Sequence, residues 1–255
     1  QLSTPTVLLL LFCFYGLTFL VSLRVGRKDE NVDGYMVSNN SIGFGMAAAS
    51  MTATWIWAAS FYAAASSGYK FGLSGALHYG FWGALMILFI YPFGRRFREL
   101  APKAHTLAEI MHARHGRSSQ MILAGSNIVG SMISLMVNFT AAGALVAVLS
   151  PLSFIHGVLI AGCGILGYTI WSGFRSSVLT DFGQLIAMIF AAVVIIPIIF
   201  FQLGGPELFA QGMPNISAEQ ASFYSKTAIL EQGAPYFVAV LAYAIGTQTI
   251  AQRLF

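Results

Sequence analysis

One acidic residue, Asp181, lies at the start of a long apolar stretch and could bind a cation. No charged residue follows it until after Pro206. An ionisable side chain inside a segment long enough to cross a membrane is costly, and it usually faces the protein interior or water. Thr180 and Gln184 are close enough in sequence to share an ion or a hydrogen-bond network with Asp181. The alternative is a solvated carboxylate near the membrane surface, paired with Arg175.

Two other apolar stretches are interrupted by small and hydroxylated residues. Residues 47–62 are rich in Ala, Ser and Thr and contain Trp55 and Trp57, and residues 246–249 read Gly-Thr-Gln-Thr. Interrupted backbone at membrane depth is tolerated only where it lines a cavity or is buried in protein. We therefore expect two broken helices, with carbonyl groups freed for a cation and tryptophans walling a polar pocket. The alternatives are a tightly packed continuous helix at 47–62 and an early helix end at Gly246.

Other kinds of chemistry have little support. His112 and His115 are one helical turn apart and, with Glu109, loosely imitate metal ligands, but a solvated helix explains them better. The sequence has no phosphate-binding loop, no nucleophile elbow and no paired carboxylates suited to hydrolysis. Cys13 and Cys163 both lie in apolar runs, where we expect them to be small buried hydrophobes. We expect no enzyme, no catalytic residues and no cofactor.

The composition predicts an all-α polytopic membrane protein. Hydrophobic residues make up 57% of the 255 residues and charged residues only 9%, whereas a soluble domain carries about 25% charged residues. Several charge-free stretches are long enough for the roughly 20 apolar residues that a spanning helix needs. The net charge of +4 does not indicate a nucleic-acid partner, because Lys and Arg set orientation in such proteins.

We place seven spans along the chain and deduce their orientation from the loops. The spans are Thr6–Arg24, Ile42–Ser67, Ser74–Phe93, Met121–Leu149, Phe154–Trp171, Ser177–Leu203 and Pro235 to the chain end. Only Lys70 and Lys226 of the 13 Lys and Arg residues fall on one side. Loops 24–41, 94–120 and 172–176 are therefore predicted to be cytoplasmic, with the N-terminus outside an inner or plasma membrane. Residues 106–115 are predicted to form an amphipathic helix whose Leu107, Ile110 and Met111 lie against the membrane.

Several motifs resemble the sodium:solute symporter family. Residues 172–184 are similar to its glycine-turn, Thr-Asp and Gln pattern, and Ala251-Gln-Arg253 matches the Gln-Arg pair that closes its sixth core helix. Residues 34–43 resemble its approach to the first core helix. Residues 55–59, 68–75 and 101–116 look most like the urea-transporting branch, whereas residues 246–253 differ from it. Sugar-binding positions read Trp55, Ala59, Ser60 and Tyr79, which makes a sugar an unexpected solute.

The resemblance implies a leucine-transporter-type fold, in which five core helices are followed by five more in inverted topology. Residues 1–41 would then be an extra N-terminal helix and its loop, and residues 42–203 the complete first repeat. Residues 204–234 would be an outer loop, and residues 235–255 the first helix of the second repeat. The chain would be a single transmembrane domain fragment, with a C-terminal remainder expected beyond it.

The resemblance also implies sites. Backbone carbonyls of Ala53 and Ile56 would belong to the family's sodium site, and Asp181, with Thr180 beside it, matches the acidic residue of a further cation site. Tyr243 matches the aromatic gate over the solute. Residues near pocket positions are Trp55, Tyr79 and Gln248, beside the Trp57 already noted.

The function that follows from the resemblance is sodium-coupled import of a small polar, uncharged, urea-like solute by alternating access. The partners would be Na⁺, the solute and the lipid bilayer. A rival of a different class is a symporter-like sensor domain of a histidine kinase or another signalling protein, because both would share these spans. A channel is a third possibility, although no pore-lining ring of residues is visible.

Overall fold

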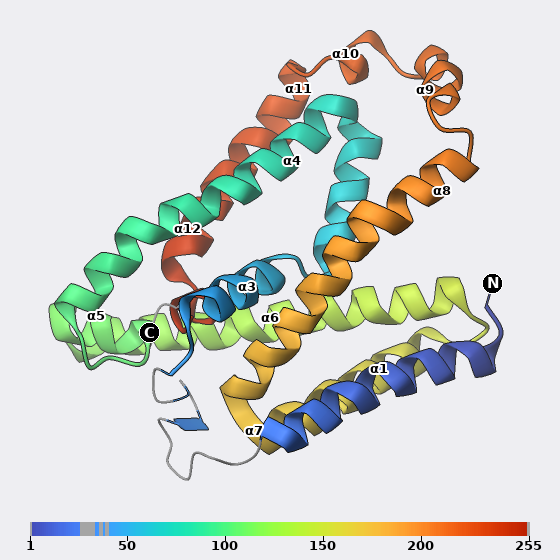
Figure 1. Cartoon of the computed structure of the whole chain (residues 1–255). Helices are drawn as coiled ribbons and strands as arrows, with labels where there is room; N and C mark the ends of the chain where they lie inside the picture. Colours follow the sequence, from blue (N-terminus) through green and yellow to red (C-terminus); the bar gives the residue numbers. More distant parts are fainter. Residues whose placement is uncertain (1, 26–33, 36–37, 39–40, 254–255) are drawn as a thin grey trace. The chain divides into compact units, whose positions relative to one another are not determined.

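The computed structural model describes residues 2–25, 34–35, 38 and 41–253 (Figure 1). The chain divides into two compact units. The first comprises residues 1–59, 100–184 and 248–255, and the second comprises residues 60–99 and 185–247. All regular elements of the described residues are helical. Most of the predicted loop 24–41, with much of the motif at 34–43, lies outside the described residues.

Within the described residues, six helices are long and apolar enough to cross a membrane, which confirms the predicted polytopic class. They are Thr4–Arg24, Ala58–Leu100, Arg117–Leu149, Phe154–Trp171, Gly173–Gln202 and Lys226–Gly246. The predicted span Ile42–Ser67 is not one continuous helix. It is divided between α3 (Phe44–Trp55) and the first part of α4 (Ala58–Leu100). The last predicted span starts too late at Pro235, because helical structure already begins at Lys226.

In the first unit, α1 (Thr4–Val25) packs along the first half of α7 (Phe154–Phe190) (Figure 1). The Ser22 hydroxyl donates a hydrogen bond to the Tyr168 carbonyl at 3.1 Å. The Tyr15 ring lies so close to Gly164 that an added Cβ would approach it to 2.5 Å. A small residue and a buried hydroxyl are what close packing between helices in lipid requires.

Two glycines reverse the chain within what are otherwise continuous helical runs. Gly72 in α4 has φ 65° and ψ −144°, and Gly173 in α7 has φ 60° and ψ −145°. Side chains with a Cβ avoid this backbone conformation. Space is also lacking, because a Cβ would lie 2.1 Å from the Gln220 carbonyl oxygen at Gly72 and 2.6 Å from that of Tyr35 at Gly173. The predicted turns at 68–73 and 172–176 are therefore each made by one residue.

The helix α7 runs through a wider turn into α8. Residues Ala191–Ile195 form a π-helical segment, η2, and α8 follows at Ile196–Gln202. Pro197 at the start of α8 has no amide to donate to the preceding turn. A single π-turn before such a residue is a recognised way for a helix to absorb the missing hydrogen bond.

The predicted helix at 106–115 is present as α5 (Leu107–His115) and ends at Gly116. Its N-terminus is capped by Thr106, whose hydroxyl accepts from the Glu109 amide at 3.2 Å. The expectation that its apolar residues lie against the membrane is wrong. Leu107 and Ile110 are only 3% and 4% exposed, because they pack inside the first unit, where α5 contacts α6 (Arg117–Leu149).

In the second unit, α12 (Ala234–Gly246) packs on the part of α4 that follows Gly72 (Figure 1). The rings of Tyr79 and Tyr236 stack with centroids 4.9 Å apart, and Trp82 contacts Phe237 at 4.7 Å. Such aromatic pairs stabilise packing beyond the area they bury.

The predicted outer loop 204–234 of the second unit consists largely of short helical segments. They are α9 (Glu207–Gly212), η3 (Met213–Asn215), α10 (Ala218–Ala221), α11 (Lys226–Ala228) and η4 (Ile229–Gly233). Gln232 donates hydrogen bonds to the Ser67 hydroxyl and, at 3.4 Å, to the Gly75 carbonyl. The segment before α12 is therefore fastened to α4 on both sides of Gly72.

Candidate cation site and helix breaks

The first predicted helix break is present at Ile56 and Trp57. Helix α3 ends at Trp55, and Ile56 has φ −92° and ψ 80° while its amide still donates to the Thr52 carbonyl at 3.1 Å. Helix α4 begins at Ala58. The last carbonyls of a helix that stops in this way lack the next amides of the ladder. Ala53, one of the two residues whose carbonyls the resemblance assigned to a sodium site, lies in that last turn, and the other, Ile56, lies in the break itself.

The second predicted break is present at Thr247. Helix α12 ends at Gly246, Thr247 is extended with φ −99° and ψ 122°, and α13 (Gln248–Ala251) resumes the helix. The Thr247 amide donates to the Tyr243 carbonyl at 3.2 Å. The end at Gly246 is thus an interruption followed by further helix, and not the end of the helical segment.

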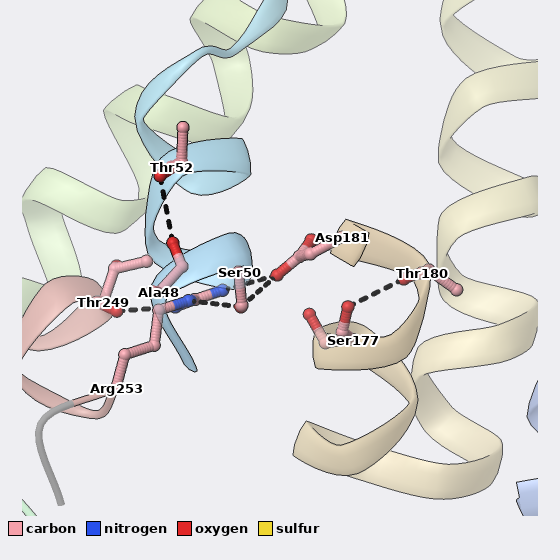
Figure 2. Close-up of polar contacts among 8 residues, drawn as sticks. All are labelled: Ala48, Ser50, Thr52, Ser177, Thr180, Asp181, Thr249 and Arg253. Atoms are coloured by element: carbon pink, nitrogen blue, oxygen red, sulfur yellow. Dashed lines mark hydrogen bonds and ion pairs between the residues drawn. The ribbon is translucent and has the colours of Figure 1, made fainter. Parts of the chain in front are cut away.

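A buried polar network joins α3, α7 and Arg253, the second residue after α13 (Figure 2). The Ser50 hydroxyl donates to Asp181 Oδ2 at 2.5 Å, and Arg253 Nη2 donates to the same oxygen at 3.0 Å. Arg253 Nε also donates to Ser50 Oγ at 2.8 Å. The side chains of Arg253 and Asp181 are only 6% and 14% exposed. One carboxylate oxygen therefore holds together segments that are far apart in the sequence.

Two further contacts fix the Arg253 side chain. Its Nη1 donates to the Thr249 carbonyl at 2.6 Å, and its guanidinium lies 5.7 Å from the centre of the Phe174 ring. A planar guanidinium suits such a site, because it donates in several directions and packs on an aromatic face. The sequence offered Arg175 as the partner of Asp181, and that pairing is wrong.

The predicted cation ligands do not all point to one place. Figure 2 shows Asp181 directed toward Ser50 and Arg253, whereas the neighbouring Thr180 points away from them. The Thr180 hydroxyl donates to the Ser177 carbonyl at 2.9 Å, and the residue is 6% exposed. Ser50 and Ala53 are both buried and lie one helical turn apart on α3. The network therefore lies on the same face of α3 as Ala53, which belongs to the last turn before the first break.

Gln248, predicted near the solute pocket, has its side chain engaged in other contacts. Its Oε1 accepts from the Leu107 amide at 2.7 Å, and its Nε2 donates to the His105 carbonyl at 3.4 Å. Its own amide donates to Asn127 Oδ1 at 2.8 Å. Sequence reasoning missed Asn127 and Ser50. A polar residue within the predicted span 121–149 was the available signal for Asn127, and the small-residue stretch for Ser50.

The four aromatic residues predicted to bind solute lie near the breaks or on α4. Trp55 and Trp57 flank Ile56 in the first unit and are half-buried. Tyr79 and Tyr243 belong to the second unit, where Tyr79 stacks on Tyr236 and Tyr243 lies four residues before Thr247. Within the described residues, no group of three or more His, Cys, Asp or Glu side chains could hold a metal ion.

Apolar spanning helices, two helix breaks and a buried ion pair between Asp181 and Arg253 define a polytopic membrane protein with an internal polar site. The chain belongs to the sodium:solute symporter family, whose model matches residues 35–255. The predicted resemblance is thereby confirmed.

Individual relatives are similar over part of their length. The chain is 23% identical over 168 residues to probable urea active transporter 3 of Schizosaccharomyces pombe, covering 64% of the chain and 25% of the relative. It is 29% identical over 224 residues to the sodium/pantothenate symporter of Escherichia coli, covering 84% and 45%. It is 22% identical over 196 residues to the urea-proton symporter DUR3 of Oryza sativa, covering 75% and 27%. The chain therefore spans between a quarter and a half of these relatives. No solved structure matches it significantly.

Proposed function

We propose that the full-length protein containing this chain is a sodium-coupled secondary transporter, and not an enzyme, that imports a small polar, uncharged solute by alternating access. The observation that carries the proposal is the buried network of Ser50, Asp181 and Arg253 beside two helix breaks. Buried charges and interrupted helices at membrane depth are expensive, and transporters use them for ions and solutes. Membership of a symporter family supports the same function.

For the coupling ion we propose a site at the carbonyl oxygens of Ala53 and Ile56. Na⁺ is a hard cation, and freed backbone carbonyls at a helix break are its usual ligands in such folds. Asp181, with Thr180 beside it, is proposed as a second cation position. Ser50 and Arg253 both donate to Oδ2 of Asp181 in this conformation, so a cation would bind this carboxylate through Oδ1 or after the guanidinium withdraws.

For the solute we propose aromatic contacts: Trp55 and Trp57, which flank the first break, and, separately, Tyr79 and Tyr243. Aromatic walls with few charged groups suit a small polar solute. Two of the relatives are named for urea and for pantothenate, and the lack of further charged groups at these positions favours an uncharged compound such as urea. Gln248 enters this proposal through its backbone position in the second break, since its side-chain amide binds elsewhere.

We further propose the leucine-transporter-type repeat arrangement for the chain. Residues 42–203 would form the first repeat, residues 204–234 an outer loop and residues 235–255 the start of the second repeat, with residues 1–41 as an added helix. Loops 24–41, 94–120 and 172–176 would face the cytoplasm because they hold most of the Lys and Arg residues. Sodium would then favour the conformation in which its ligands converge. The shift of that equilibrium can be no larger than the difference in sodium affinity between the conformations.

Uptake of labelled urea into proteoliposomes tests the proposal. The full-length protein should accumulate urea when the outside buffer contains NaCl and the inside contains choline chloride. Unchanged uptake after choline chloride replaces NaCl in the outside buffer would refute sodium coupling. An imposed proton gradient without sodium is the second arm, because one relative is named a urea-proton symporter. Urea flux driven by protons alone would show that the coupling ion is H⁺ and not Na⁺. Currents far above carrier turnover would indicate a channel.

A further inference from the structure

The second helix break is joined to α5 and α6 through one residue, Gln248. Its backbone amide donates to Asn127 Oδ1 at 2.8 Å, and Asn127 Nδ2 donates to the Leu123 carbonyl of its own helix at 3.0 Å. This second bond fixes which side of the Asn127 amide faces Gln248. The first amide of α13, which the break deprives of a helical acceptor, is thereby satisfied by a side chain from α6.

The side chain of Gln248 completes the N-terminus of α5. Thr106 satisfies the Glu109 amide at 3.2 Å, and Glu109 Oε2 in turn accepts from the His105 amide at 2.9 Å. The first amide of α5, that of Leu107, donates to Gln248 Oε1 at 2.7 Å. Residues adjacent in sequence thus cap part of this helix end, and a residue 141 positions further along the chain caps the rest.

Burial shows that this junction is packed as well as hydrogen-bonded. Leu107 and Ile110 of α5 are 3% and 4% exposed, and Ile250 and Ala251 of α13 are 1% and 4% exposed. A buried amide left without its acceptor is costly, so moving α13 away from α5 would cost both packing and hydrogen bonds. The favourable course is for the two short helices to move together.

From these contacts we infer that Gln248 is a positioning residue that fastens α5 to the second helix break, and that its side chain does not bind the solute in this conformation. Both functional ends of its amide are already used, Oε1 by Leu107 and Nε2 by His105. A solute that took over these same hydrogen bonds would have to break the cap of α5. The structural part of the inference rests on these contacts alone, and its effect on transport rests on the proposed function.

Hydrogen exchange of the Leu107 amide in the full-length protein tests the structural part. Gln248→Met keeps the shape of the side chain but removes the acceptor, and it should speed exchange at Leu107 about fivefold, as expected for the loss of one hydrogen bond. Gln248→Glu keeps an acceptor and places negative charge at a helix N-terminus, so exchange should stay close to that of the parent protein. Gln120→Met is the matched control, because no hydrogen bond of the Gln120 side chain is found within the described residues.

Unchanged exchange at Leu107 in Gln248→Met would overturn the inference. If that variant does not fold, Asn127→Leu gives the same test, because it removes the acceptor of the Gln248 amide and leaves the Gln248 side chain in place. Faster exchange at both Gln248 and Leu107 supports the inference, and unchanged exchange at both amides refutes it.

Transport kinetics then separate positioning from solute binding. In sodium-driven uptake of labelled urea, Gln248→Met should lower the maximal rate while KM for urea changes by less than about twofold, and Gln248→Glu should restore the rate. A rise in KM that Gln248→Glu does not reverse would identify a solute ligand and refute the inference. A parent protein without any urea uptake would count against the proposed function, whereas the exchange experiment would still decide the role of Gln248.

Discussion

The ion pair between Asp181 and Arg253 allows a quantitative prediction about stability. The two charged groups are 3.0 Å apart, and at an effective dielectric constant of about 20 they attract each other by about 5.5 kcal/mol. Their side chains are 14% and 6% exposed, so each has also lost several kcal/mol of hydration. These terms nearly cancel in the intact pair. They do not cancel when one partner is removed, because the other charge stays buried.

We expect Arg253→Met to lower the free energy of unfolding by about 3–5 kcal/mol, the usual cost of breaking a buried pair. Asp181→Asn should also destabilise the protein, because it leaves the guanidinium unpaired. The double variant Asp181→Asn/Arg253→Met leaves no buried charge there and should be at least about 2 kcal/mol more stable than the sum of the single effects predicts. Denaturant unfolding of the full-length protein in detergent, followed by tryptophan fluorescence, measures all three values.

A control for this cycle is available at the end of α4. Arg95 and Glu99 also form an ion pair, at 3.2 Å, but their side chains are 73% and 46% exposed. Arg95→Met should therefore change stability little, because solvent already screens that pair. Additive effects of the two buried substitutions, or an Arg253→Met variant as stable as Arg95→Met, would refute the reasoning. Arg253→Lys should fall between the parent protein and Arg253→Met, since it keeps the charge but loses the planar fork of donors.

Three other predictions concern glycine, pH and sodium. Gly173→Ala should destabilise the protein by about 1–3 kcal/mol or more, because Ala strains this backbone conformation and its Cβ would clash with Tyr35. Gly167→Ala on the same helix should not, since nothing lies within 4 Å of a Cβ there; thermal unfolding distinguishes the two. Hydrogen bonds from Thr227 and then Ser225 lower the pKa of Glu219. The stability they contribute should be complete above the unfolded pKa of about 4.3 and be lost as pH falls through the lower folded value. The melting temperature of Glu219→Gln should therefore depend less steeply on pH in this acid range than that of the parent protein. An equal pH dependence in the two proteins would contradict the stabilising role of these hydrogen bonds. Sodium at ten times its Kd should stabilise the full-length protein by about 1.4 kcal/mol relative to choline at the same ionic strength; equal melting temperatures in the two salts would argue against a sodium site.

The sequence was informative wherever a local pattern decides the structure. Small and polar residues inside apolar runs predicted both helix breaks, because such backbone survives in a membrane only when protein or a cavity surrounds it. Helical spacing and Gly116 predicted α5 almost to the residue. The family itself followed from short motifs near Asp181 and Arg253, and the match over residues 35–255 confirms it.

The sequence was uninformative wherever distant segments meet. Arg175 is six residues from Asp181 and Arg253 is 72 residues away, so spacing alone favoured the wrong partner. The early start of the last spanning helix was missed for a similar reason. Lys226 and Glu231 made residues 226–233 look like a loop, yet Glu231 lies 3.6 Å from Lys70 on α4. Only the packed structure supplies that neighbour. The prediction that the apolar residues of α5 lie against the membrane was wrong because such residues fit a membrane surface and a protein interior equally well.

The two helix breaks also have a mechanical consequence. The chain passes from one compact unit to the other after residues 59, 99, 184 and 247. Two of these crossings coincide with a break or follow it within a few residues, at Ile56–Trp57 and at Thr247. Torsion about the backbone of one or two residues there disrupts no helical ladder, whereas the crossing after residue 184 lies within the helix α7 and the one after residue 99 lies at the end of α4. At the first break, the residue that permits this rotation, Ile56, is also one whose carbonyl we propose as a sodium ligand, so a cation bound there would restrain that joint.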